Sequence, residues 1–408
     1  MFWPEIFKEY LCEDGTIIVL LVQALYGQVD SPRMFHNHLV EMMLEVSYIL
    51  NDIDRGLFSK DISEEVEKGE YQKVEVTSHV DDLLAIPPLS YASKYIKEMK
   101  KQFGEDLVVD SNIDENGKLS SNKEVKYLGM CIKINYEEQY AEINPKDFYL
   151  MILKDTEDLH ENKVKKLPGG KDFFEDDPES QLLSGVIKER LEKVAYQLRW
   201  PSFMAPETTN YAAKFVSKIK TGLTEEDKEK MIHFLKYINS RYDMPLKIGP
   251  GKDGKIKLNM YSDASYGVKC YTAGAMTVGR GVIYVNHHKQ SIVSLASAHS
   301  ELYAASNNMT HALHVQHIME SRGMDEDTYR PGIFHVDNMA VIHLMKNGRA
   351  TNSKSKHIHI RYFFMKQHFD IGDFELVHCA TDKMIADILT KALQGKLFFK
   401  IRALLLSH

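Results

Sequence analysis

Hydrophobic residues along this chain follow two spacings, and each spacing predicts a kind of element. In "TSHVDDLLAI" (77–86), apolar positions flank the adjacent acids Asp81 and Asp82, which predicts two short strands that meet at a bend carrying both carboxylates. A spacing of three and four residues, typical of amphipathic helices, marks residues 143–156 and most of 182–245. Beyond residue 257 the two patterns alternate, so we expect an α/β chain.

Turn-rich segments divide the chain. A polar stretch around 160–180 contains "PGG" and "EDDP", and "IGPGKDGKIK" (248–257) is a cluster of Gly, Pro and Lys. The 408 residues exceed what one ordinary core accommodates. We therefore expect three domains: 1–142 with mixed helices and strands, a mostly helical 143–250, and 251–408, in which strands and helices alternate.

Composition bounds the class of protein. A hydrophobic content of 44% and a charged content of 27% are typical of a soluble globular protein. The longest apolar run, Ile17 to Val22, is far shorter than the ~20 residues of a membrane span, and no signal-peptide pattern opens the chain. We expect a cytoplasmic or nuclear protein that is not secreted. The 4 cysteines lack paired spacing, so a metal site would use oxygen ligands.

Four acids in the last third occupy suggestive local contexts. Asp263 is expected at the end of a strand, and Asp337 at the end of another. Glu301 is expected in the first turn of a helix, and Asp387 in the early turns of a helix that begins near residue 381 or 382. Taken singly, each acid is more simply a helix cap or a surface charge.

Together the four acids predict a metal centre. Strand ends and helix starts converge at one edge of an open α/β sheet. Four carboxylates there suit two divalent cations about 3.5–4 Å apart, the arrangement that hydrolyses phosphodiesters. We expect two Mg²⁺ ions, with Mn²⁺ as the alternative. Asp81 and Asp82 also suit a hard cation, although an acidic turn exposed to water is the simpler interpretation of that pair alone.

Charge is distributed unevenly. The net charge of −7 does not favour a partner that is a polyanion. Residues 331–408, however, contain 11 Lys and Arg against 6 Asp and Glu. This part of the chain is either a surface that faces phosphates or a solvated basic face.

Motifs along the chain resemble those of a known family. "ALYGQVDSPRMF" (24–35), "SHVDDLLAI" (78–86) and "KYLGMCIKI" (126–134) resemble, in order and spacing, the palm of a copia-type LTR-retrotransposon reverse transcriptase. The motifs "YSDAS", "TAGAMTV", "HHKQSIVSLASAHSELYAA", "HVDN", "SKHIHIRYFF" and "TDKMIADILTKAL" resemble the attached ribonuclease H domain. The resemblance covers nearly the whole chain and is weakest around 155–220.

The resemblance assigns roles to the expected domains and acids. It implies a partial α+β palm over 1–142, a helical thumb and connection over 143–250, and an α/β ribonuclease H-like domain with a mixed sheet over 251–408. Asp81 and Asp82 would be the metal-binding pair of the polymerase. The metal-binding and catalytic acids of the nuclease would be Asp263, Glu301, Asp337 and Asp387.

The resemblance also implies nucleic-acid partners, an RNA/DNA hybrid and a template-primer, together with other Pol-derived chains. Arg33 lies in the segment that in the family helps to hold template and nucleotide. His357 matches a position near the nuclease substrate path, with a structural histidine as the alternative. Lys354, Lys356 and Arg361 are expected to contact phosphates.

Three departures from the family limit the expected activity. The third palm acid belongs upstream of the segment that "MFWPEIF" (1–7) matches, and no residue here corresponds to it. His79 replaces a tyrosine of the family, and Asp30 replaces a glutamine. Since losing one electrostatic contributor costs roughly 10²–10³ in rate, we expect DNA synthesis only within a longer polyprotein.

These observations favour a truncated reverse transcriptase–ribonuclease H polypeptide that hydrolyses RNA in RNA/DNA hybrids. The alternative is a non-catalytic product, either a nucleic-acid-binding or assembly module or a decayed element fragment. An enzyme acting on small molecules is disfavoured, because no Gly-rich nucleotide loop is present in a strand-to-helix setting.

Overall fold

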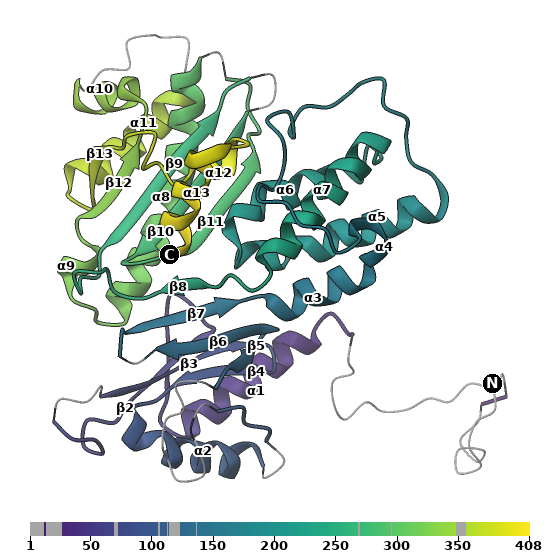
Figure 1. The fold of residues 1–408 in the computed structure, drawn as a ribbon. Helices are drawn as coiled ribbons and strands as arrows, with labels where there is room; N and C mark the ends of the chain where they lie inside the picture. Colours follow the sequence, from purple (N-terminus) through teal and green to yellow (C-terminus); the bar gives the residue numbers. More distant parts are fainter. Residues whose placement is uncertain are drawn as a thin grey trace. The chain divides into compact units, whose positions relative to one another are not determined.

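The computed structural model describes residues 12–13, 27–68, 72–104, 107–111, 113, 123–135, 137–267, 270–294, 296–347 and 356–408, with the backbone alone at 347 and 356–359. Helices and sheets are interspersed along the chain, which confirms the predicted α/β class (Figure 1). Two compact units are present, Met1–Val109 and Asp110–His408. The division into three domains stays a prediction. Within the described ranges, no helix is long and apolar enough to cross a membrane.

In its described residues, the first unit contains a four-stranded antiparallel sheet and two helices. Alternate residues of the third strand, Val74 and Val76, are buried with Leu39, Met43 and Met99 from the helices, which explains why an alternating sequence folds as a strand here. The sheet order is β1-β2-β3-β4. The elements are α1 (Ser31–Glu45), β1 (Ile49–Leu50), β2 (Leu57–Asp61), β3 (Lys73–His79), β4 (Asp82–Ile86) and α2 (Leu89–Phe103).

The hairpin predicted around the two adjacent acids is confirmed. Strands β3 and β4 pair antiparallel, with His79 opposite Asp82. The turn consists of Val80, at φ 55°, and Asp81. Both acids therefore lie at the tip of the hairpin.

The second unit begins with a small antiparallel sheet of order β5-β6-β7-β8. Gly129 at the β5–β6 turn has φ 73°, and a Cβ there would lie 2.4 Å from the ring of Phe148, so the glycine of "KYLGM" is required by both conformation and space. The strands are β5 (Val125–Tyr127), β6 (Met130–Asn135), β7 (Tyr140–Asn144) and β8 (Leu246–Ile248).

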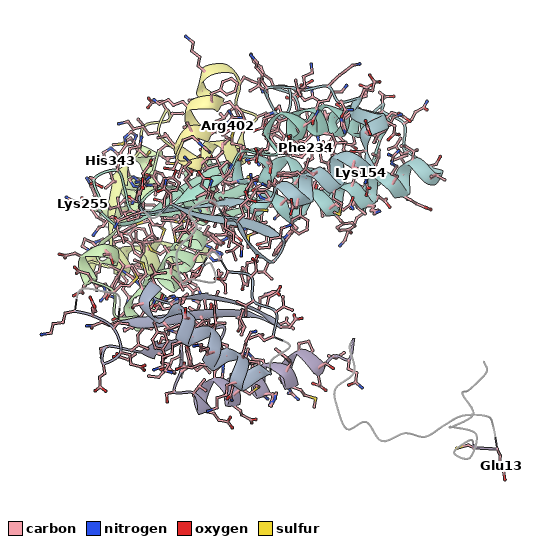
Figure 2. The ribbon with its side chains drawn as sticks, turned by 60° about the horizontal axis from the view of Figure 1, so that its bottom comes forward. Glu13, Lys154, Phe234, Lys255, His343 and Arg402 are labelled. Carbon is pink, nitrogen blue, oxygen red and sulfur yellow. The ribbon has the colours of Figure 1, made fainter. Side chains whose placement is uncertain are left out.

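A helical layer follows, as the spacing of apolar residues predicted. Its longest helix begins with a capping box, in which Thr224 and Asp227 satisfy each other's backbone N–H groups. Tyr211, Phe215 and Phe234 are fully buried between the helices (Phe234 is labelled in Figure 2). The elements are α3 (Lys146–Asp155), α4 (Glu157–His160), α5 (Gly185–Arg199), η2 (Pro201–Phe203), η3 (Pro206–Thr208), α6 (Thr209–Lys218) and α7 (Glu225–Arg241).

The last part of the second unit is built on a five-stranded mixed sheet of order β11-β10-β9-β12-β13. Strand β10 pairs antiparallel with both β11 and β9, whereas β12 is parallel to both β9 and β13. The strands are β9 (Leu258–Ser265), β10 (Tyr271–Val278), β11 (Val282–Lys289), β12 (Gly332–Val336) and β13 (Phe374–His378). The helices are α8 (Ser297–Ser321), α9 (Glu326–Tyr329), α10 (Met339–Asn347), α11 (Lys356–Asp370), α12 (Asp387–Thr390) and α13 (Gly395–Leu406).

Two cores cover the opposite faces of this sheet. Met276 of β10 packs with Leu302 of α8, whereas Ala273 and Ala275 of the same strand belong to the core that contains Ile388 of α12. Because successive side chains of a strand point to opposite faces, α8 and α12 lie on different sides of the sheet (Figure 1). Acidic residues on the two helices can therefore approach the strand ends from both sides.

The prediction that a helix begins near residue 381 or 382 was wrong. Residues 381–383 form a turn, and the helix begins only at Asp387. All side chains from 384 to 389 are buried, with Met384 and Ala386 in one cluster and Ile385 and Ile388 in another. A helix with a single apolar stripe cannot bury consecutive residues in two directions, so tertiary packing overrides the local pattern.

Candidate metal centre

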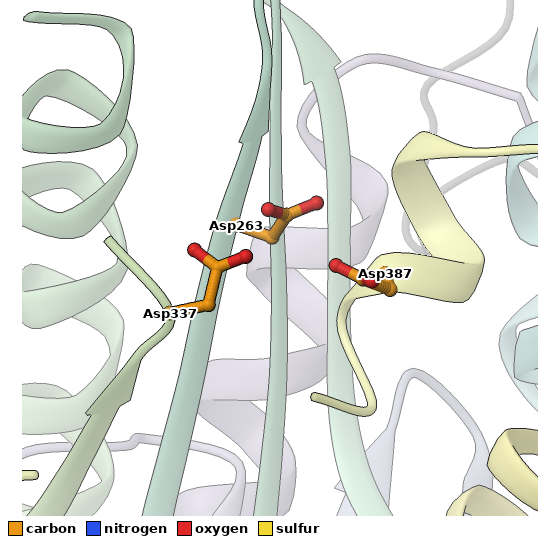
Figure 3. A group of neighbouring side chains, drawn as sticks. All are labelled: Asp263, Asp337 and Asp387. Atoms are coloured by element: carbon orange, nitrogen blue, oxygen red, sulfur yellow. The ribbon is translucent and has the colours of Figure 1, made fainter. Parts of the chain in front are cut away.

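Three carboxylates of the second unit converge at the strand ends. Asp263 lies on the central strand β9, Asp337 directly follows β12, and Asp387 is the first residue of α12. One oxygen from each of the three lies within 4.8 Å of the others (Figure 3). Asp263 and Asp387 are buried, and Asp337 is half-buried. The prediction that a short strand ends at Asp337 agrees with β12, which ends at the preceding residue. The prediction that a strand ends at Asp263 was two residues short, because β9 continues to Ser265.

Glu301 lies beside this group rather than within it. Helix α8 begins at Ser297, so Glu301 is its fifth residue and not part of the first turn as expected. The side chain is buried. Burial, followed by the charges of Asp263 and Asp337, raises the pKa of Glu301 to about 9. The carboxyl group is therefore close enough to the three aspartates for their charges to act on it.

Burial also raises the pKa values of two of the aspartates. It raises the pKa of Asp263 to about 7, opposed by the charge of Lys391 and a hydrogen bond from Thr390. The pKa of Asp387 is likewise raised by burial. Carboxylates that are costly to ionise and close together are stabilised when a cation joins them.

Two residues that the sequence analysis did not identify complete the surroundings of these acids. The Thr390 hydroxyl donates to Asp263 Oδ2. Lys391 Nζ donates to Asp387 Oδ1 at 2.8 Å and lies 3.7 Å from Asp263 Oδ2. The signal for Lys391 in the sequence was its i, i+4 spacing from Asp387 within "ADILTKAL", whereas Thr390 had no such signal.

The donors fit a hard divalent cation. Mg²⁺ and Mn²⁺ prefer carboxylate oxygens. Asp387 Oδ2 is buried and has no hydrogen-bond partner among the described atoms, so it is an oxygen that can accept a metal bond without losing another contact. The aspartate group can thus hold a metal ion.

The acids at the hairpin tip of the first unit have different surroundings. Asp81 and Asp82 are both exposed. In the part of the chain that the structure describes, no third metal-ligating side chain completes a group with them. Arg33 Nη2 lies 3.3 Å from Asp30 Oδ1 on the exposed start of α1, so a cation accompanies the acid that replaces the family's glutamine.

Of the remaining four residues predicted to contact nucleic acid, Arg361 has a side chain in the described part of the structure. Lys354 lies outside the described residues, as do the side chains of Lys356 and His357 at the start of α11. Arg361 Nη1 donates to Ser306 Oγ at 2.7 Å and to Asn307 Oδ1 at 2.8 Å. These two acceptors lie on α8, the helix that carries Glu301.

Comparisons with known proteins were made for the whole chain. No family model matches it. Curated relatives include the retrovirus-related Pol polyproteins from transposons RE1 and RE2 of Arabidopsis thaliana, each 22% identical, over 93% and 96% of this chain and 24% and 25% of their own lengths. The retrovirus-related Pol polyprotein from transposon TNT 1-94 of Nicotiana tabacum is 21% identical over 96% of this chain and 28% of its own length. The chain thus spans about a quarter of the length of these relatives. The resemblance inferred from the motifs is confirmed, and the chain is a homologue of the Pol polyproteins of copia-type retrotransposons.

Proposed function

We propose that residues 251–408 hydrolyse the RNA strand of RNA/DNA hybrids with two divalent cations, Mg²⁺ or Mn²⁺. The observation that carries the proposal is the convergence of Asp263, Asp337 and Asp387 within 4.8 Å. Buried carboxylates gathered from two strands and a helix are costly unless a cation binds there. Divalent ions at such a site supply the Lewis acidity that activates the attacking water and stabilises the leaving oxygen.

Each acid has a distinct part in this proposal. Asp263 and Asp387 are the buried ligands, held by Thr390 and Lys391. Asp337 is the half-buried ligand and so the most accessible of the three to a phosphodiester. Glu301 retains its proton at neutral pH and releases it when positive charge enters the site.

The relatives and the distribution of charge support the proposed substrate class. Pol polyproteins are the curated homologues. The excess of Lys and Arg in residues 331–408 supports phosphate contacts on this domain, with Lys354, Lys356, His357 and Arg361 as the proposed residues. Arg33, in the first unit, is proposed to contact nucleic acid separately. A hybrid can be recognised by its shape and its 2′-hydroxyls without contacts to bases. Binding should therefore weaken steeply as salt increases.

DNA synthesis is not part of the proposal for this chain. Asp81 and Asp82 form an exposed pair that lacks a third ligand within the described ranges. We propose polymerase activity only for a longer polyprotein that supplies the missing acid.

The test is a gel assay on an end-labelled RNA/DNA hybrid with Mg²⁺. The natural chain is compared with Asp263→Asn and with Asp382→Asn, a control at an exposed acid that pairs with Lys400. We expect cleavage by the natural chain and the control, and a loss of at least ~10² in rate for Asp263→Asn. Equal cleavage by all three proteins, or none by the folded natural chain, would refute the proposal. Salt-sensitive hybrid binding without cleavage would instead support the non-catalytic binding module.

A further inference from the structure

Lys391 is positioned as a cation within the acid group. It follows α12 and lies one helical turn after Asp387. Its Nζ is 2.8 Å from Asp387 Oδ1 and 3.7 Å from Asp263 Oδ2. One ammonium group therefore contacts two carboxylates that come from different elements, a strand and a helix.

The adjacent residue reinforces this arrangement. Thr390 donates its hydroxyl to Asp263, while Lys391 donates to Asp387. Two consecutive side chains thus fix the two buried acids. Both acids are 1% exposed, whereas the side chain of Lys391 is 44% exposed. The ammonium group consequently lies where it can leave the acids for water without disturbing a core.

No other cation shares this position in the part of the chain that the structure describes. The only ion pairs of Asp263 and Asp387 there are those with Lys391, and Asp337 has none. A divalent cation bound to the same carboxylates would lie within a few ångströms of the ammonium nitrogen, where like charges repel strongly at low dielectric.

We propose that Lys391 is a built-in counter-cation that competes with the divalent metal for Asp387 and Asp263 and so sets the metal affinity of the site. The inference rests on the metal site of the proposed function. Asp387 offers its unpartnered Oδ2 to the metal, while Oδ1 is bound by Lys391. The metal and the ammonium group would therefore lie on the two oxygens of one carboxylate, where their charges repel, and the Lys391 charge opposes the loading of the site.

The test measures metal binding without an activity assay. Mg²⁺ alone is titrated into the full chain while its thermal unfolding is followed, and Mn²⁺ binding is measured from the free-ion signal in electron paramagnetic resonance. The variants are Lys391→Met, which removes the charge but keeps the apolar stem, and Lys391→Arg, which keeps the charge. Lys400→Met is the matched control, because it removes an equal charge from an exposed pair with Asp382.

We expect Lys391→Met to bind both ions about tenfold more tightly than the natural chain, since one opposing charge at this distance is worth about one to three powers of ten in an equilibrium. In chelator, Lys391→Met should unfold at a lower temperature than the natural chain, and Mg²⁺ should restore most of the difference. Lys391→Arg and Lys400→Met should bind the ions as the natural chain does.

The outcomes separate this inference from the proposed function. Equal metal affinity in the natural chain and Lys391→Met would overturn the competition while leaving the metal site in place. Binding by neither protein would overturn both. Tighter binding in Lys391→Met, with wild-type affinity in Lys391→Arg, would establish the competition. If Lys391→Met does not fold, weaker or unchanged affinity in a Lys391→Gln variant would also refute it.

Discussion

Asp263 on β9 and Asp337, which directly follows the neighbouring parallel strand β12, occupy corresponding positions. His335 on β12 pairs in register with Tyr261 on β9. Asp337 lies two residues after His335, and Asp263 lies two residues after Tyr261. The rings of His335 and Tyr261 stack with centroids 4.2 Å apart. Because residues two apart on a strand share a face, this stack lies next to the two carboxylates. Burial lowers the pKa of His335 to about 4, so its ring adds no positive charge at neutral pH.

We predict that Asp263→Asn unfolds at a higher temperature than the natural chain in chelator at pH 8. The buried Asp263 carboxylate is costly to ionise, as its pKa of about 7 indicates, and the isosteric amide removes that cost while still accepting from Thr390. The measurement is calorimetric or fluorescence-detected unfolding, with exposed Asp382→Asn as the control. A less stable Asp263→Asn would show that Lys391 already compensates the charge fully.

We also predict that the chain without metal loses stability as pH rises from about 5 to 9. Glu301 has a pKa of about 9 when folded against an ordinary value of 4.5, so the folded chain keeps a proton that the unfolded chain releases. Stability from this proton is complete below pH 4.5 and is lost as pH rises towards 9. Asp263 adds a similar loss between 3.8 and about 7.

The measurement for this prediction is the urea midpoint across that pH range in chelator. Glu301→Gln cannot titrate, so its decline above pH 7 should be clearly shallower than that of the natural chain. Identical slopes would mean that the Glu301 carboxyl group is hydrated. Adding Mg²⁺ should flatten the slope of the natural chain, because a cation favours the ionised carboxylates.

Local signals in the sequence were enough for several of these features. The alternation of Val74 and Val76 located the hairpin, and the short strand before Asp337 located that acid, because period-two burial is a property of neighbouring residues. The predicted convergence of acids at the strand ends agrees with the positions of the three aspartates. The metal and catalytic roles of these residues stay predictions.

Other features depend on contacts that a local pattern does not contain. The start of α12 is set by two cores that bury residues 384–389, and Asn210, from a distant helix, donates to the backbone of Ile388 there. The contact of Lys391 with Asp263 joins residues far apart in the sequence, whereas only its spacing from Asp387 is visible locally. Burial of charge is decided by tertiary packing, which single-sequence periodicity does not report.

We predict that Arg361→Lys destabilises the second unit by about 1–2 kcal/mol, because lysine keeps the charge but lacks the planar guanidinium that lies over an aromatic ring while donating to two acceptors. Arg361 Nη1 joins α11 to Ser306 and Asn307 of α8, and its guanidinium carbon lies 4.0 Å from the ring centroid of Tyr303. Urea unfolding is the measurement. The control is Lys366→Arg on the same helix, where Lys366 pairs with Asp370. Unchanged stability with weaker hybrid binding would favour a role in phosphate contact alone.

We predict no incorporation of nucleotides by this chain on an RNA template with a DNA primer, and unchanged hybrid cleavage by Asp82→Asn. Asp81 and Asp82 are exposed at a hairpin tip of the first unit, whereas the aspartate group lies in the second. Primer extension tests for the incorporation of nucleotides, and the gel assay tests hybrid cleavage by Asp82→Asn. Template-dependent extension that Asp82→Asn abolishes would show that two acids suffice.

The largest single effect on stability is predicted at an ion pair outside the metal centre. Glu207 and Arg241 are both fully buried, with Arg241 Nε donating to Glu207 Oε1 at 2.8 Å. Tyr237 also donates to Glu207 Oε1, at 3.2 Å. Arg241→Met should cost about 3–5 kcal/mol, because it leaves an uncompensated carboxylate in the core.

Chemical unfolding of single and double variants tests this prediction. Glu207→Leu combined with Arg241→Met should recover part of the loss, since apolar side chains of similar volume replace a buried pair at little cost. Lys163→Met, which removes an exposed partner of Glu161, is the control and should change stability by less than about 1 kcal/mol. A double variant as unstable as Arg241→Met alone would mean that the pair fixes the packing of η3 and α7 geometrically, through its hydrogen bonds, rather than by neutralising charge.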